Sequence, residues 1–245
     1  MKFKKTLEYK DLIASIDASI VTFDDLVDGN YQEGRKAVIR HDVDVDLDRA
    51  IEMASEEAEL GIQSTYFLLH SAKYFDYSDK FLEKCLKISE LGHNIGLHND
   101  LLVQYFGRRK DIRNSLNKML SFLREHVEVR GTSCHGQRCC YSAGYLNYEV
   151  WTEFDSTRNE GFGRPKIPKF SLKEFGLDYE TYFIDYNAYL SDSGKKWRGV
   201  SIQGKKNYER SMFADKRNVG RNIIDEFNQK EGATLQLLCH PIHWK

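Results

Sequence analysis

Two aspartates at the end of a short apolar run, Asp42 and Asp44, are the residues best placed for chemistry in this chain. The run 37–39 is typical of a strand, and side chains two residues apart in a strand point to the same side. Two carboxylates held close together either bind a cation or share a proton, and both arrangements are common at active sites. Helix capping accounts for the later Asp46 and Asp48, and leaves Asp42 and Asp44 for chemistry.

Three histidines lie in comparable positions further along the chain. His98, His135 and His240 each fall at or just past the end of an expected strand. The carboxyl ends of parallel strands meet at one edge of a sheet, where α/β folds place their sites. We therefore expect these imidazoles to lie near the two aspartates.

The elements that carry these residues alternate between helix and strand. Strands that alternate with helices pair in parallel, and enough of them close into a barrel. Apolar spacing and composition mark each element, and Gly61 and Gly92 end two of the helices. The expected helices are 9–16, 48–60, 80–91, 111–126 and 219–229, and the expected strands are 37–41, 63–69, 94–98, 127–134, 150–155, 181–186 and 234–239.

A single domain over residues 1–245 is expected, with residues 1–35 as an N-terminal helical extension. The length suits one large α/β domain, and no linker or repeat interrupts the pattern. Within the extension, residues 21–25 predict a helix start capped by Thr22, with Phe23 buried.

Composition excludes some partners and predicts a location. The 36 basic and 37 acidic residues give a net charge of −1, which would attract neither nucleic acid nor an anionic membrane. No apolar stretch is long enough to predict a transmembrane segment, and no apolar region follows the basic start to predict a signal peptide. The 5 cysteines are an odd, scattered set that favours reduced thiols, so we expect a cytoplasmic protein.

Four segments occur in a distinctive order: His-Asp-Val-Asp at 41–44, Ser-Thr-Tyr-Phe at 64–67, Gly-His-Asn-Ile-Gly-Leu-His at 92–98, and Leu-Leu-Cys-His-Pro at 237–241. Together they resemble the polysaccharide deacetylase family (NodB homology, carbohydrate esterase family 4), from residue 36 onward. The resemblance implies an α/β fold, a distorted (β/α) barrel of the NodB-homology type. It also implies removal of acetyl groups from sugars by a divalent metal and an Asp/His acid–base pair.

The resemblance also implies a role for each candidate residue. Asp42 would be the general base that activates the attacking water, and His240 the general acid that protonates the leaving group. Asp44 and His98 would be metal ligands. An aspartate with two histidines suits zinc, so we expect one divalent ion, zinc. The chemistry agrees, because a Lewis acid activates water while a carboxylate and an imidazole move protons.

One ligand of the family pattern is missing. The family places a second histidine four residues after the first, where this chain has Leu102. His135 is our candidate for the third ligand, or for the role of the family's arginine that orients the base. Asp100 is the other candidate ligand.

Substrate binding is expected from loops on the same edge. We assign Arg138 and Trp244 to substrate binding, because aromatic rings stack on sugar faces. Trp197 and Arg198 are further candidates for a binding groove, and His243 is expected to support the site.

The sequence thus predicts a metal-dependent carbohydrate deacetylase acting on an N-acetylated sugar or a cell-envelope glycan precursor. Two alternatives stay open. The missing histidine also fits a catalytically inactive deacetylase-like barrel that binds a glycan or a protein. A metal-bearing site could instead hydrolyse another amide, such as a cyclic imide.

Overall fold

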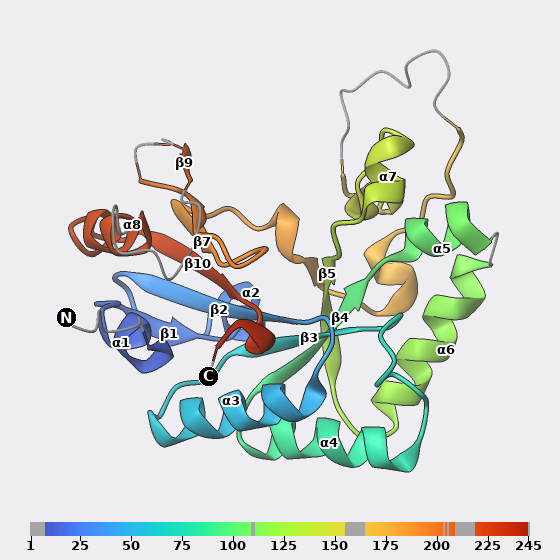
Figure 1. Cartoon of the computed structure of the whole chain (residues 1–245), viewed down its shortest axis with the longest axis horizontal. Coiled ribbons are helices and arrows are strands. Elements are labelled where there is room, and N and C mark those ends of the chain that lie inside the picture. The colour runs from blue at the N-terminus through green and yellow to red at the C-terminus, as the bar shows by residue number, and fades with distance from the viewer. Residues whose placement is uncertain are drawn as a thin grey trace, which may run out of the picture. The chain divides into compact units, whose positions relative to one another are not determined.

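The computed structural model describes residues 8–108, 111–154, 165–202, 204, 206–208 and 219–244 (Figure 1). The chain forms two compact units. The first takes both ends of the chain, residues 1–66 and 186–245, and the second takes residues 67–185. The division falls inside strand β3 (Thr65–Leu69), so each unit contains part of that strand.

The sheet of the first unit brings the two ends of the chain together. β2 (Lys36–Val43) pairs in parallel with β10 (Thr234–Cys239), and β10 pairs in parallel with β7 (Ala188–Ser191). The blue β2 and the red β10 lie side by side in Figure 1. Three strands distant in sequence therefore end at one edge. The other strands are β1 (Ser19–Val21), parallel to β2, and β8 (Arg198–Val200) and β9 (Lys206–Tyr208), which extend the sheet antiparallel beyond β7.

The helices of the first unit have ends that the local sequence explains. Asp46 caps α3 (Leu47–Glu59) by accepting a hydrogen bond from the backbone N–H of Arg49 at 3.1 Å, and Gly61 follows the helix with a φ of 71°. Apolar side chains from the helices 9–14, 47–59 and 219–228 pack with those of the sheet in a buried core. The helices are α1 (Tyr9–Ala14), α2 (Phe23–Asp28), α3 (Leu47–Glu59) and α8 (Val219–Asn228), with the 3₁₀ turn η4 (Pro241–His243) near the C-terminus.

The second unit contains three further parallel strands, β4 (Asn94–Asn99), β5 (Val129–Cys134) and β6 (Tyr179–Glu180). His98 of β4 lies in register with Ser133 of β5. Its helical elements are α4 (Asp79–Glu90), α5 (Leu101–Arg108), α6 (Ile112–Arg124), α7 (Arg138–Ser142), η1 (Asn147–Val150), η2 (Leu172–Phe175) and η3 (Thr181–Phe183). Within the described ranges, no helix combines the length and the apolar character needed to cross a membrane.

The expected fold class, an α/β fold of the distorted-barrel type, is confirmed, with parallel strands alternating with helices. The prediction for α2 also holds, because Thr22 accepts a hydrogen bond from the backbone N–H of Asp25 at 3.1 Å and Phe23 is fully buried. The N-terminal extension is not purely helical, since β1 lies within it and pairs with β2. A single domain over residues 1–245 stays a prediction.

Two expected strands are wrong. In the region 150–155, η1 ends at Val150 and Trp151 forms an isolated bridge with Phe170, while Asp155 lies outside the described residues. Glu149 closes this turn by accepting from the backbone N–H of Leu146 at 2.9 Å. In the region 181–186, the chain turns into η3 directly after the short strand β6. Apolar composition marked both segments as buried but could not distinguish a strand from a tight turn.

Candidate functional site

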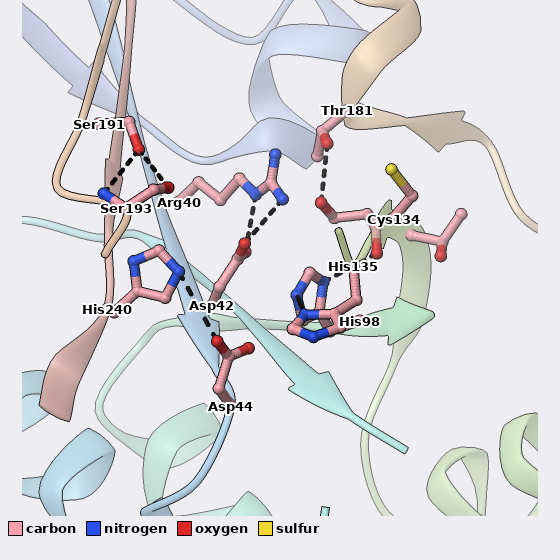
Figure 2. Close-up of polar contacts among 12 residues, drawn as sticks. Arg40, Asp42, Asp44, His98, Cys134, His135, Thr181, Ser191, Ser193 and His240 are labelled. Atoms are coloured by element: carbon pink, nitrogen blue, oxygen red, sulfur yellow. Dashed lines mark hydrogen bonds and ion pairs between the residues drawn. The ribbon is translucent and has the colours of Figure 1, made fainter. Parts of the chain in front are cut away.

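The end of β2 carries the two predicted acids. Asp42 lies within the strand and Asp44 just beyond it, because β2 extends to Val43. Arg40 lies two residues before Asp42, on the same face, and forms a two-pronged ion pair with it (Figure 2). Its Nε donates to Oδ1 at 2.7 Å and its Nη2 donates to Oδ2 at 2.8 Å. Both side chains are buried, so the planar guanidinium fixes the orientation of the Asp42 carboxylate.

The end of β10 places His240 beside these acids. Cys239 pairs in register with His41, so His240 and Asp42 come next on two adjacent parallel strands. The Nε2 atom of His240 lies 3.8 Å from Oδ2 of Asp44. The predicted base, the predicted acid and one predicted ligand therefore lie at one edge of this unit's sheet (Figure 2).

Asp192, directly after β7, holds the other nitrogen of His240. Its Oδ1 accepts from Nδ1 of His240 at 2.6 Å, and its Oδ2 accepts from the backbone N–H of His240 at 3.0 Å. A carboxylate can only accept hydrogen bonds, so Nδ1 of His240 carries a proton. Asp192 is fully buried, and its bonds fix the direction in which Nε2 of His240 points.

The charges around His240 favour its protonated form. Burial lowers the pKa of His240, but the hydrogen bond and charge of Asp192, with the charges of Asp42 and Asp44, raise it to about 9. Burial raises the pKa of Asp192, but its contacts with His240 and His243 lower it below its ordinary value. Asp192 and His240 thus form an anion and a cation at neutral pH, which suits His240 to donate a proton.

In the second unit, β4 and β5 bring two other predicted histidines together. Nδ1 of His98 donates to the backbone carbonyl of Ser133 at 2.9 Å. Nε2 of His98 lies 3.0 Å from Nδ1 of His135, and Nε2 of His135 accepts from the side-chain amide of Gln137 at 2.8 Å. These contacts assign the proton of His98 to Nδ1, so its Nε2 presents a lone pair toward His135.

This pair fits a metal ion. Histidine ligands commonly donate their second ring N–H to a backbone carbonyl, as His98 does, and this fixes the ring and its tautomer. Two nitrogens bound to one tetrahedral zinc ion lie about 3.3 Å apart, given bonds of about 2.0–2.1 Å. The observed separation between His98 and His135 is 3.0 Å. Loss of one shared proton and a small shift would let both rings bind one ion.

The residues around the missing histidine have other partners. Leu102 is fully buried, and its backbone N–H donates to the side chain of Asn147 at 3.0 Å. Asp100, the alternative ligand, forms an ion pair with His70 at 2.7 Å between Oδ1 and Nε2. Burial raises the pKa of Asp100, but the bond with His70 lowers it below its ordinary value. His135 is therefore the better candidate for the third ligand.

The structure corrects two of the predicted binding residues. Trp244 is only 4% exposed, and its indole N–H donates to Oδ2 of Asp192 at 3.0 Å. Its ring lies in the core, with its centroid 6.0 Å from that of the buried Trp197, so neither ring is available to stack on a sugar. Arg138, on α7, and Arg198, on β8, are exposed, and their binding roles stay predictions.

Two residues of the site were missed by the sequence reasoning. Arg40 takes the orienting role that was left open for His135, and its spacing of two residues from Asp42 on a strand was the available signal. Asp192 follows the short run 188–191, whose apolar residues mark a strand end like those of the other candidates.

Comparisons with known proteins found similar structures only. No family model matches the chain, and no curated protein matches it. A Streptococcus mutans CE4 esterase is similar with a TM-score of 0.44 and 13% identity, over 94% of this chain and 82% of that one. The catalytic domain of a peptidoglycan N-acetylglucosamine deacetylase from Eubacterium rectale is similar with a TM-score of 0.41 and 12% identity, over 84% and 76% of the two chains. The Bc1960 peptidoglycan N-acetylglucosamine deacetylase is similar with a TM-score of 0.39 and 14% identity, over 85% of this chain and 87% of that one. At such scores these likenesses carry no weight for the activity or the substrate of this chain.

Proposed function

We propose that this protein is a metal-dependent hydrolase that removes the acetyl group from an N-acetylated sugar or a glycan precursor. The observation that carries the proposal is the pairing of a base and an acid at neighbouring strand ends. Asp42 is oriented by Arg40, and His240 is held protonated by Asp192. Hydrolysis of an amide needs both functions, because water must lose a proton and the leaving amine must gain one.

Each residue has a separate step in this reaction. Asp42 takes a proton from the attacking water, and Arg40 keeps the carboxylate turned toward that water. His240 gives the proton on Nε2 to the departing amine, while Asp192 stabilises the imidazolium through Nδ1. A bound divalent ion would supply Lewis acidity, which polarises the acetyl carbonyl and eases the ionisation of water.

Asp44, His98 and His135 are the proposed ligands of that ion, and zinc is the proposed metal. The support is the position of all three at the carboxyl ends of parallel strands, together with the ring geometry of the histidine pair. Arg138 is the proposed contact to the carbohydrate. The buried free thiols of Cys85 and Cys239 support the proposed cytoplasmic location, because that compartment is reducing.

Metal content and acetate release test the proposal together. We expect purified protein loaded with zinc to bind the metal, and to release acetate from one of a panel of N-acetylated sugars and oligosaccharides. Asp42→Asn should keep the metal and lose turnover, whereas Asp44→Asn should lose turnover together with the ion of the proposed catalytic site. Less than about 0.1 ion per chain would favour the inactive binding module. Hydrolysis of cyclic imides alone would contradict the deacetylase assignment.

A further inference from the structure

A second group of metal-ligating side chains lies in the first unit, around Asp192. The sequence His-Pro-Ile-His places His240 and His243 three residues apart across the 3₁₀ turn η4. The backbone N–H of His243 donates to the carbonyl of His240 at 2.9 Å, and Pro241 at the first position restricts the turn further.

The turn brings both imidazoles to the same carboxylate. Nδ1 of His240 lies 2.6 Å from Oδ1 of Asp192, and Nδ1 of His243 lies 3.2 Å from Oδ2. One ligand atom from each of the three residues lies within 4.8 Å of the others. The rings are 5.0 Å apart and tilted by 35°. Zinc commonly takes two imidazole nitrogens, one carboxylate oxygen and a water.

His243 brings to this group a ring nitrogen that is shielded from solvent. Its Nδ1 lies 3.2 Å from Oδ2 of Asp192, an oxygen that also accepts from the indole of Trp244 and from the backbone N–H of His240. A metal ion would bind the same nitrogen and the same carboxylate. The side chains of His240 and His243 are each 11% exposed, so an ion could reach the group from solvent.

We infer that Asp192, His240 and His243 form a second site for zinc or a similar divalent transition metal. The ion takes the place of the proton between His240 and Asp192, which leaves to solvent, and His243 binds as the tautomer that carries its proton on Nε2. One carboxylate oxygen and the Nδ1 atoms of both histidines bind the ion, and water fills the fourth position. The indole of Trp244 and the backbone N–H of His240 keep their bonds to Asp192.

Occupation of this site would regulate the reaction, and this consequence rests on the proposed function. A ring that carries zinc on Nδ1 keeps its remaining proton on Nε2 tightly, so it no longer acts as an imidazolium acid. The ion here displaces a proton held by a carboxylate at 2.6 Å, whereas at the proposed catalytic site it displaces a proton shared between two imidazole rings, so we expect this second site to bind metal more weakly. Zinc would thus activate the enzyme at low concentration and inhibit it in excess.

Metal counting on the full chain tests the inference without any activity assay. We expect calorimetric titration with zinc to give about two ions per chain, and cobalt(II) absorption to rise in two phases. His243→Asn should lose only the weaker ion and His98→Ala only the tighter one. His126→Asn, at an exposed histidine outside both groups, is the matched control and should keep both. His243→Gln is the second variant if His243→Asn proves unstable.

Each possible result either supports or overturns the second metal site. A wild-type count of one ion that His243→Asn leaves unchanged would overturn it, and so would a weaker ion that survives both His243 variants. Where acetate release is measurable, excess zinc should inhibit the wild type by about tenfold or more and His243→Asn much less, each relative to its own maximum. Absence of turnover in all variants would contradict the proposed function, while the metal count would still test the second site.

Discussion

The two faces of β2 carry two buried ion pairs with different organisation. On one face Arg40 pairs with Asp42, two residues along the same strand. On the other face His41 pairs with Glu57 of α3, with Nε2 and Oε1 2.7 Å apart and both side chains fully buried. The first pair is local to one strand end. The second joins segments that are distant in sequence.

Glu57 is the centre of a network on the core side of the strand. Its Oε1 accepts from His41 and from the hydroxyl of Tyr9, and its Oε2 accepts from Ser64 at 2.6 Å and Tyr66 at 2.7 Å. Tyr9 belongs to α1 and Tyr66 to β3. The imidazole of His41 also stacks on Tyr66, with centroids 4.4 Å apart. A pair at a strand end can thus serve chemistry, whereas a buried carboxylate with four donors from three other segments serves stability.

The largest expected effect is a loss of activity when the Arg40–Asp42 face of β2 is altered. Asp42→Asn should lower turnover about 10²–10⁴-fold, because an amide cannot accept the proton of the attacking water. Zinc content should stay unchanged. Stability falls as well, since Arg40 stays buried without its anion, so turnover must be measured per folded molecule. Turnover that survives in folded Asp42→Asn would refute the proposed catalytic role of the Arg40–Asp42 face.

The next effect is a loss of stability, and it concerns the core face of β2, which carries His41 and its partner Glu57. Glu57→Gln should lower the free energy of unfolding by about 3–5 kcal/mol, because it removes one partner of a buried pair. Denaturant unfolding measures the loss. Glu59→Gln, two residues on in the same helix and 75% exposed, is the matched control and should change stability by less than about 0.5 kcal/mol. Similar losses in the two variants would contradict the assigned network.

The sequence predicted the helices, strands and caps that depend on local patterns of apolar and polar residues. α3 and its cap, β2, β10 and the Thr22 cap follow from apolar spacing and nearby polar residues, and the structure confirms them. The alternation of strands and helices also predicted that Asp42 and His240 lie at the same edge of a sheet, while the pairing of β2 with β10 is a finding of the structure.

The rest of the fold and of the candidate site depends on contacts between residues that are distant in the sequence. In the sequence, Glu57 looks like an ordinary exposed acid on a polar helix. Its burial is explained by hydrogen-bond donors from three other segments. Trp244 reads as a ring free to bind a sugar, but a hydrogen bond to Asp192, 52 residues away, holds it in the core. Spacing along the chain carries no information about either partner.

The pH dependence of stability sharpens the comparison further. Burial raises the pKa of Glu57, but His41 and the hydroxyl donors lower it from 4.5 to about 2. A carboxyl whose pKa is lower in the folded state stabilises the protein fully above about pH 4.5, and this contribution is lost as the pH falls toward 2. The contribution is at most about 3 kcal/mol. Urea unfolding across this window should show a smaller loss of stability in Glu57→Gln than in the wild type. Equal losses would mean that other acids control the acid sensitivity.

The smallest effect tests whether the core-face donors act together. Tyr9→Phe removes a hydroxyl that donates to Glu57 and keeps the ring, whose centroid lies 5.3 Å from that of Trp244. We expect a loss of about 1–2 kcal/mol, because the lost bond is to a charged acceptor, and no change in turnover per folded molecule. In the Glu57→Gln background the same substitution should cost less, since the charge that the hydroxyl served is gone. An equal cost in both backgrounds would show that Tyr9 stabilises the fold independently of Glu57, and the core face of β2 would then not act as one cooperative network.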